Sequence, residues 1–446
     1  MLKRAIVIGN SIAGLLASKA LSEHFQEVII LEKRGERHEK TTQQAVPQSY
    51  HPHVLLKRGE QEIKKLFPQI FDELIENGSV VNDFTANLKW YHFGFWKQPF
   101  LGGIQLIQQS RTMLEVHLQK SVNQLSNVNI KYGVKVKKLL MEKKKNKIYG
   151  VTVKCNTTKT TREIHADLVI DASGYGSNNI SWLKDYGIEV KEEKVEIKLF
   201  YATRLFCIEK ENRPDWCNLL ISPSLPENPF GAYIQSIEDN VFSVTFSGYT
   251  NVDAPKTNEE FLAYAKKLFV PDVGHFLEKA SPITDLKVYK ISDQVYRRFD
   301  QVKGIPEGFV VIGDAHCRFD PMFGQGISVA AMQATELSEF LQRTTHISNN
   351  FSVNFHRKIA NYIATPWDMA TTEALRHPGI KGRRPLILPI KQWYIKKIYQ
   401  QAAVDSNIYM RLVKVMNLIE SPITLFYPDV ILSLLKNKKS RNKEKL

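Results

Sequence analysis

Three segments far apart in the chain each join a short apolar run to an acidic residue and glycines, and this series constrains the fold more than any other feature. In the last of them, an acid and paired glycines follow the apolar run 309–312, at Gly313, Asp314, Gly324 and Gly326. Short β-branched runs of this kind are typical of buried parallel strands, and open α/β sheets bind ligands at the carboxyl ends of such strands. The chain is therefore predicted to contain a parallel sheet with a ligand at its carboxyl edge.

The residues that follow this strand suit a flavin ring. A carboxylate at Asp314 can accept hydrogen bonds from ribityl hydroxyls, and bare backbone at Gly324 and Gly326 can approach a flat ring. The run 328–337 is predicted to be a helix whose positive amino end would stabilise the anionic edge of a reduced flavin. Pro321 belongs to the same segment. The alternative is a tight strand-helix connection in which the glycines permit the backbone conformation of the turn and bind no ligand.

The amino terminus carries the first segment. An apolar run leads into Gly9, Ser11 and Gly14 and then into an amphipathic helix. A second apolar strand ends at Glu32, roughly 20 residues after Gly9, which is the spacing at which an acid meets a ribose hydroxyl. Ser11 stands where the dinucleotide pattern has its second glycine, so a small hydroxyl lies where the backbone approaches a pyrophosphate. The order of strand, turn and helix predicts a Rossmann-like unit.

The remaining segment, 166–177, is an apolar strand that ends in Asp171 and continues to Gly174. Alone it is a strand-to-turn connection common to all α/β proteins. The three segments in series, however, resemble the single-component (group A) FAD-dependent monooxygenases, the group of para-hydroxybenzoate hydroxylase. Within that group the chain is similar to the FAD-dependent epoxidases and hydroxylases of polyketide and isoprenoid tailoring. This closer resemblance is carried by four further stretches: 46–56, 109–115, 201–205 and 379–385.

The resemblance implies a fold and roles for particular residues. The fold is α/β, with a discontinuous Rossmann-like FAD-binding domain of the glutathione-reductase type, an antiparallel-sheet substrate domain and a helical C-terminal region. Arg111 would reach the FAD phosphates, Asp314 the ribitol and Glu32 the adenosine ribose. Asp171 and Gly174 would lie where the cofactor-binding segments converge. NADPH or NADH would be the reductant and O2 the oxidant.

Two departures from the resemblance concern the reductant and the flavin edge. Many relatives carry an arginine shortly after the acid-glycine motif, whereas the residues between Ser177 and Lys184 include none. How the nicotinamide cofactor docks is therefore left open. Ser328 stands where asparagine is common, and serine is shorter and has a different set of hydrogen-bonding atoms. We expect FAD binding to survive both changes.

Domain boundaries follow from the positions of the cofactor segments. Residues 346–446 are expected to form a helical C-terminal region that ends in a basic tail. The run 241–248 alternates apolar and hydroxyl-bearing residues, which predicts an antiparallel sheet that walls the substrate pocket. The other predicted divisions are an FAD-binding domain of residues 1–45, 105–183 and 285–345 and a substrate domain of residues 46–104 and 184–284.

Tyr201 and Arg204 are the candidate catalytic residues at the reacting face. Both lie in a predicted strand, and strict alternation would place them on opposite sides of the sheet unless the strand bulges. Packing within the sheet is the competing interpretation. The aromatic-rich stretch 90–100 is likewise either core or the wall of an apolar substrate cavity.

Composition bears on other classes of protein. The net charge of +15 is accompanied by no nucleic-acid recognition module, so nucleic acid is not an expected partner. The four cysteines show no paired metal spacing, and His51 and His53, whose spacing could serve a metal in a strand, have no Cys, Asp or Glu partner nearby in sequence. No metal site and no disulfide is therefore predicted, and a structural or ring-lining role is expected for the two histidines. No run approaches the ~20 apolar residues of a membrane-spanning helix. The apolar start breaks at Gly9, unlike a signal peptide, and we expect a cytoplasmic protein.

The basic tail that begins at Lys436 follows the apolar stretch 423–435. A solvated end is one interpretation of this order. The other is peripheral contact with a membrane, because basic residues beside apolar ones are attracted to anionic lipid.

Three activities are compatible with these cofactor motifs. The first is an FAD-dependent monooxygenase that uses NAD(P)H and O2 to epoxidise or hydroxylate an apolar, polyketide- or isoprenoid-like small molecule. The second is an FAD-dependent reductase or dehydrogenase of the isoprenoid type. The third is a non-catalytic flavoprotein that holds an apolar ligand. The tryptophan-rich motif and the lysine setting of flavin halogenases are not recognisable, which disfavours halogenation.

Overall fold

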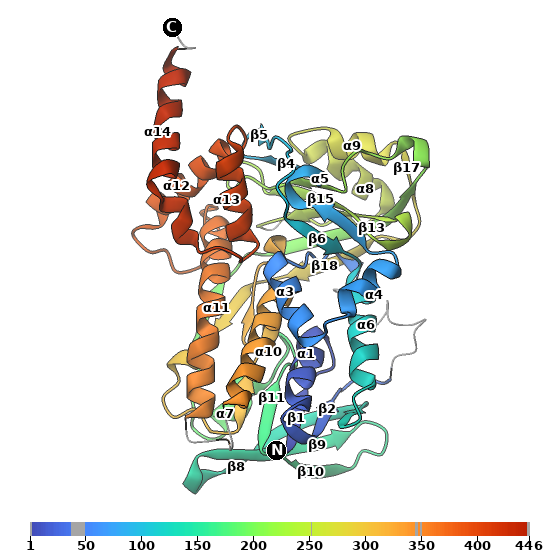
Figure 1. Cartoon of the computed structure of the whole chain (residues 1–446), viewed down its shortest axis with the longest axis vertical. Helices are drawn as coiled ribbons and strands as arrows, with labels where there is room; N and C mark the ends of the chain where they lie inside the picture. Colours follow the sequence, from blue (N-terminus) through green and yellow to red (C-terminus); the bar gives the residue numbers. More distant parts are fainter. Residues whose placement is uncertain (1, 37–49, 251, 344–346, 348–349, 444–446) are drawn as a thin grey trace.

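A five-stranded parallel sheet organises the lower half of the molecule (Figure 1). The computed structural model describes residues 2–36, 50–250, 252–343, 347 and 350–443, so residues 46–49 of the stretch 46–56 lie outside the described residues. The strands are apolar because the sheet is covered on both faces. In sheet order they are β20 (Phe309–Val311), β11 (Leu168–Asp171), β1 (Leu2–Ile8), β2 (Phe25–Leu31) and β7 (Val128–Lys131).

Helices cover one face of this sheet and a second sheet covers the other. The helical side buries a continuous apolar core that includes Leu15, Ile63 and Leu337, each fully excluded from solvent. The opposite core packs the parallel strands against an antiparallel sheet of β8 (Val134–Glu142), β9 (Lys147–Cys155) and β10 (Thr161–His165). The covering helices are α1 (Ile12–Ser22), α3 (Lys57–Leu66), α4 (Ile70–Glu76), α6 (Arg111–Asn123) and α10 (Gly326–Gln342). This arrangement confirms the predicted Rossmann-like domain.

An eight-stranded, mostly antiparallel sheet forms the upper half of the molecule (Figure 1). Its strands pair antiparallel except where β14 runs parallel to β4. This sheet confirms the prediction of an antiparallel layer. The path order is β17 (Ala280–Pro282), β13 (Leu199–Ile208), β16 (Phe242–Gly248), β15 (Phe230–Ser236), β14 (Asn218–Ile221), β4 (Leu88–His92) and β5 (Phe95–Trp96), while β18 (Lys287–Ile291) pairs with β13.

The two faces of this sheet differ in chemistry. Phe242, Val244 and Phe246 of β16 are buried in an apolar core with residues of α8 (Asn258–Ala263) and α9 (Asp272–Leu277). Their neighbours Ser243, Thr245 and Ser247 are equally buried but point to the opposite face, because successive side chains of a strand alternate. The alternation seen in the sequence therefore separates an apolar core from a polar wall.

The C-terminal helices are attached to both halves. Helix α11 (Phe351–Ala374) begins against the parallel sheet, where Phe355 and Ile359 join the helical core, and ends beside the eight-stranded sheet. Pro366 lies within it. It is followed by α12 (Leu388–Gln401), α13 (Ser406–Met416), a 3-10 turn η10 (Pro422–Phe426) and α14 (Pro428–Lys443), which projects from the body of the molecule (Figure 1). The predicted helical region is confirmed, and α11 links the two sheets.

Neither a membrane-spanning helix nor a metal site is found in the described part of the chain. Among the described residues, no helix combines the length and the apolar character needed to cross a bilayer. The same residues contain no group of His, Cys, Asp or Glu able to hold a metal ion, and all four cysteines are free.

Short elements complete the fold. The remaining strands and helices are β3 (Val80–Asp83), β6 (Gln105–Gln108), β12 (Glu192–Val195), β19 (Gln294–Arg297), β21 (Cys317–Arg318), α5 (Phe84–Asn87) and α7 (Asn179–Lys184).

Substitutions on the two faces of β16 should lower the free energy of unfolding by different amounts. Phe246→Ala should lower the free energy of unfolding by about 3–5 kcal/mol, because it leaves a cavity in a closed apolar core. Thr245→Val keeps the side-chain volume and removes one hydroxyl, which donates or accepts a 2.6 Å hydrogen bond with Thr203, so it should cost only about 1 kcal/mol. Denaturant unfolding of the purified variants checks this, and equal losses would mean that the faces are wrongly assigned.

Candidate functional site

The turn after β1 allows a very close approach of backbone segments. Gly9 has φ +104°, and a Cβ atom there would lie 2.7 Å from the carbonyl oxygen of Ala172 at the end of β11. A Cβ atom on Gly14 would lie 2.0 Å from the carbonyl oxygen of Gly9. Side chains cannot be accommodated at either position. The turn is therefore a bare-backbone cradle at the amino end of α1, the kind of site that binds phosphate.

Arg111 lies beside this cradle. It is the first residue of α6, whose N-cap Ser110 accepts a hydrogen bond from the backbone of Met113. One terminal guanidinium nitrogen, Nη2, donates to Ser11 Oγ at 3.2 Å, and the other, Nη1, lies 2.9 Å from His53 Nε2. The structure thus brings together Ser11 and Arg111, which are 100 residues apart, in an arrangement that fits a pyrophosphate.

His53 is a functional neighbour that the sequence did not assign. Its Nδ1 lies 2.8 Å from the carbonyl oxygen of His51, and its Nε2 faces Arg111. Burial, and then the nearby Arg111 charge, hold the pKa of His53 well below its ordinary value, so the ring is neutral and Nε2 can accept from the guanidinium. His53 therefore helps to aim Arg111 at the cradle rather than binding a metal.

Glu32 is held in place at the end of β2. Its carboxylate accepts hydrogen bonds from the backbone of Asn10 at 3.0 Å and from the backbone and Nε of Arg34, both at 2.9 Å. Burial alone would raise the pKa of Glu32, but these hydrogen bonds and the Arg34 charge outweigh it and lower the pKa. An ionised acceptor beside the cradle suits a ribose hydroxyl. That role stays a prediction.

Asp171 organises its own turn. The carboxylate is fully buried and accepts from the backbone of Ser173 at 3.1 Å, from Ser173 Oγ at 2.5 Å and from Asn179 Nδ2 at 2.8 Å. Gly174 follows with φ +81°, a conformation that glycine adopts without strain. Protein donors occupy the carboxylate, so Asp171 shapes the region where the cofactor segments converge and does not present free acceptor atoms there.

Asp314 differs from Asp171 because it keeps its acceptor atoms free. It follows Gly313, whose φ is +61° and where a Cβ atom would lie 2.9 Å from the Cβ of Ala13 on α1. None of the described residues donates a hydrogen bond to the Asp314 side chain. Partial burial raises its pKa, and the charges of Arg111 and Arg318 oppose this effect. A half-buried acid without a protein donor is well suited to accept from ribitol hydroxyls.

The turn between Asp314 and α10 lies over the substrate domain. Gly324 has φ +63°, and a Cβ atom there would lie 3.0 Å from the Cβ of Val54. Pro321 begins the 3-10 turn η9 (Pro321–Phe323), and Gly326 begins α10, where a Cβ atom would meet only Asp314 Oδ1, at 3.7 Å. The amino end of α10 and bare backbone at Gly324 thus occur together, as the flavin interpretation requires.

Two residues absent from the sequence prediction hold this turn. Asp320 accepts from the backbone of Met322 at 3.0 Å and from the Tyr249 hydroxyl at 2.6 Å. Burial raises the pKa of Asp320 to about 6, although both hydrogen bonds favour the ionised form. Tyr249 follows β16, so this bond ties the turn to the eight-stranded sheet. Ser328 also has a structural role, because its Oγ accepts from the backbone of Leu56 at 3.1 Å.

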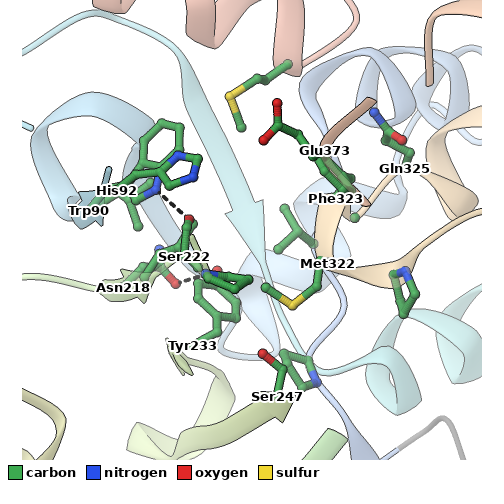
Figure 2. Close-up of a pocket in the computed structure, with 18 of the residues that line it drawn as sticks. Trp90, His92, Asn218, Ser222, Tyr233, Ser247, Met322, Phe323, Gln325 and Glu373 are labelled. Carbon is green, nitrogen blue, oxygen red and sulfur yellow. Dashed lines mark hydrogen bonds between the residues drawn. The ribbon is translucent and has the colours of Figure 1, made fainter. Parts of the chain in front are cut away.

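An open cavity of about 1460 Å³, a volume that includes solvent at its mouth, lies between this turn and the polar face of the eight-stranded sheet. Figure 2 shows Met322 and Phe323 of the turn on one side and Asn218, Ser222 and Tyr233 of the sheet on the other. Helices α11 and α12 contribute further lining residues. Among the residues named as sites from the sequence, Tyr201, Pro321 and Gly324 line the cavity.

The structure separates Tyr201 from Arg204. Strand β13 pairs with β16 in unbroken register, without a bulge, so the two side chains lie on opposite faces. Tyr201 is buried at the cavity, 5.9 Å from the ring of His51 between centroids. Arg204 donates through Nε to the Thr284 carbonyl at 3.1 Å and lies 5.6 Å from the Phe206 ring, in the apolar core. The pairing of Tyr201 and Arg204 as catalytic residues is therefore corrected, and Arg204 is a packing residue.

The aromatic stretch 90–100 contributes less to the cavity than its composition predicted. Trp90 is the aromatic of this stretch that lines it, and its indole Nε1 donates to Ser222 Oγ at 2.9 Å (Figure 2). Tyr91 packs instead with Trp96 in the core on the other face, because odd and even residues of β4 point apart. Lining by the whole stretch is thus corrected to lining by Trp90 and His92.

Together these features define a dinucleotide-binding α/β protein with a substrate cavity against its cofactor edge. The glycine cradle, the Arg111 and Ser11 pair and the free carboxylate of Asp314 fit the parts of FAD. The family model for FAD dependent oxidoreductases matches residues 5–309. The chain belongs to this family, and FAD is its cofactor.

Individual relatives support the same fold. Protein Rv3254 of Mycobacterium tuberculosis is 29% identical over 384 residues, which cover 82% of this chain and 78% of that protein. The flavin-dependent brominase Bmp2 superposes with a TM-score of 0.68 at 13% identity, covering 99% of both chains. PqsL of Pseudomonas aeruginosa, a probable FAD-dependent monooxygenase, gives 0.63 at 15% identity over 84% of this chain and 98% of that one. The p-nitrophenol 4-monooxygenase PnpA of Pseudomonas putida gives 0.65 at 13%, covering 94% and 99%.

Asp314 offers a direct test of the cofactor site. Asp314→Ala should weaken FAD binding about ten- to a hundredfold, because hydrogen bonds to a charged acceptor contribute about 1.5–3 kcal/mol. Asp314→Asn keeps one acceptor oxygen and should lose less. Flavin fluorescence titration of the apoprotein measures both affinities. An unchanged FAD affinity in folded Asp314→Ala would show that Asp314 does not accept hydrogen bonds from the ribitol.

A pair of glycine variants tests the turn. Gly324→Val should impair flavin reduction and oxygen reactivity more than it impairs folding, because its side chain would crowd Val54 in a left-handed backbone conformation. Gly274→Ala, on helix α9 and outside the cofactor segments, is the control, since its Cβ would meet only a contact of ordinary length in a helical backbone. Reduction potential and stopped-flow oxidation should change in Gly324→Val alone. Ordinary values in a folded, FAD-loaded Gly324→Val protein would contradict the expected proximity to the ring.

Proposed function

We propose that this protein is an FAD-dependent monooxygenase that uses NAD(P)H and O2 to epoxidise or hydroxylate a small molecule held in the cavity. The observation that carries the proposal is the position of the cavity. It meets the bare backbone of Gly324, where the flavin edge is expected, and it is closed by a separate sheet. The names of PqsL and PnpA, which share the fold, agree with monooxygenation.

Bound FAD supplies the redox chemistry, and the protein supplies position and environment. The amino end of α10 offers backbone N–H groups to negative charge at the ring edge. Asp320 and Tyr249 hold the turn that carries Gly324 against the sheet, and the buried Tyr201 ring closes the cavity nearby. The largely apolar lining limits the access of water, which would protect the oxygenation chemistry from loss. Few side chains need to move a proton.

The cavity favours an amphipathic substrate over a pure hydrocarbon. Its helix and turn side presents Met322, Phe323 and Met369, as an apolar substrate requires. The sheet side presents hydroxyl and amide groups, and among them Ser247 Oγ is buried without a hydrogen-bond partner among the described residues. Since a buried hydroxyl without a partner is costly, a substrate oxygen is its natural complement. A polyketide-like molecule fits this wall better than an isoprenoid hydrocarbon.

Turnover measurements distinguish monooxygenation from the alternatives. In the presence of a polyketide-like substrate, NAD(P)H oxidation, O2 uptake and product should appear in equal amounts, and the added oxygen atom should come from labelled O2. An isoprenoid-type reductase would saturate a double bond under anaerobic conditions. A non-catalytic flavoprotein would retain the ligand without turnover. Either of the last two results would overturn the proposal.

The polar wall gives a prediction about substrate affinity. Ser247→Ala should raise KM about three- to tenfold, because the loss of one hydrogen bond costs about 0.5–1.5 kcal/mol, and it should leave FAD binding unchanged. Arg204→Gln is the matched control on the opposite face of the sheet and should leave KM unchanged. Steady-state kinetics checks both variants. An increase in KM for Arg204→Gln with none for Ser247→Ala would mean that substrate binds elsewhere.

A further inference from the structure

The C-terminal helical region exposes large apolar side chains on its outer surface. At the start of α12, Leu386 is 100% exposed, Ile387 64%, Ile390 66% and Trp393 57%. On η10, Ile423 is 63% exposed and Phe426 49%. Soluble surfaces carry single apolar residues routinely, but a cluster of this size marks an interaction site. We call these six residues the α12 face.

The α12 face is held together by geometry as well as by sequence. Ile390 and Trp393 are three residues apart and lie on one side of α12, and Leu386 and Ile387 lie in the turn that leads into it. The neighbouring Tyr394 ring stacks on Phe426 with centroids 4.8 Å apart and 10° between planes. Its hydroxyl donates to the Leu425 carbonyl at 2.6 Å. These contacts bring η10 beside α12 and present both sets of side chains outward.

The charged residues of the segment that contains α12 are all basic. Residues 374–404 contain no Asp or Glu. Four of the basic residues in this segment are paired with acids outside it: Arg376 with Glu373, Lys381 with Glu196, Lys391 with Asp368 and Lys396 with Glu227. Arg383 and Lys397 form no ion pair with any described residue. The basic residues of the segment are Arg376, Lys381, Arg383, Arg384, Lys391, Lys396 and Lys397.

We propose that the α12 face docks the protein onto the surface of an anionic lipid bilayer. An apolar stripe flanked by lysine and arginine, with a tryptophan among the apolar residues, is the pattern of helices that lie in the membrane interface. A second copy of the chain is disfavoured as the occupant, because both copies carry a net charge of +15. Nucleic acid would pair with the basic residues and leave the isoleucines and leucine in water.

This assignment places the contact on α12 and η10 and not on the basic tail alone. The basic tail begins within α14, which projects from the same end of the molecule (Figure 1), so its sequence adds attraction to the same surface. Helix α12 also contributes Tyr399 to the cavity wall. Docking would therefore hold one wall of the cavity close to lipid, from which an amphipathic molecule can be drawn. Lipid binding itself does not depend on the proposed oxygenation.

Vesicle flotation of the FAD-loaded full chain tests the proposal. Wild-type protein should float with vesicles of phosphatidylcholine and phosphatidylglycerol and much less with phosphatidylcholine alone. Binding should fall at ~1 M salt, where charge attraction is screened. The double variant Ile390→Gln and Trp393→Gln should bind about tenfold or more weakly, because it removes apolar area without changing charge. The matched control is Leu101→Gln with Leu262→Gln, which removes exposed apolar groups elsewhere and should bind as wild type.

Several outcomes would overturn the proposal. One is failure of wild-type protein to float with anionic vesicles, and another is equal flotation of the Ile390 and Trp393 double variant. Tight binding of an unrelated duplex DNA that blocks flotation and is kept by the double variant would assign the surface to nucleic acid. A wild-type dimer that the double variant converts to monomer, with no vesicle binding, would assign it to a second copy. FAD absorbance confirms that each variant is folded.

Discussion

The close approach of backbone at the ends of β1, β11 and β20 and at the start of helix α1 is the constraint on which the rest of the structure depends. Gly9, Gly14 and Gly313 each lie where a Cβ atom would come within 3 Å of a neighbouring segment. Because these contacts involve backbone or a short alanine side chain, no rotamer change can relieve them. The same bare backbone forms a cradle that fits the FAD phosphates and brings Asp314 to the carboxyl edge, so packing and the shape of the proposed cofactor site are two results of one geometry.

The eight-stranded sheet has one face that closes an apolar core and one face that lines the cavity proposed to bind substrate. Its apolar face closes a core around Phe246 and Phe261, and its other face turns hydroxyl and amide groups toward the cavity. Since adjacent residues of a strand serve opposite faces, stability and substrate recognition can be changed separately. The bond from Tyr249 to Asp320 then couples this sheet to the turn at the flavin edge.

Helix α11 connects the cofactor domain to the outer surface. Its first half packs against the parallel sheet, where His356 Nε2 accepts from the backbone of Val311 at 3.1 Å. Its last turns reach the cavity, where Glu373 pairs with Arg376 at 2.6 Å, and the chain then enters the basic, apolar segment of α12. The chain therefore runs from the parallel strands, past the cavity, to the surface proposed to meet lipid.

The sequence by itself determined the Rossmann-like domain, the antiparallel sheet and the FAD cofactor, because strand periodicity and the glycines that permit close approach are local properties of the chain. It could not place side chains whose neighbours lie far away. Side chains alternate along β13, which places Tyr201 and Arg204 on opposite faces of the sheet. The same alternation along β4 turns Trp90 and His92, but not Tyr91, toward the cavity. Arg111 with His53 and Tyr249 with Asp320 meet across 58 and 71 residues. Only the tertiary structure decided these pairs, because strand register and domain packing depend on contacts that no local pattern encodes.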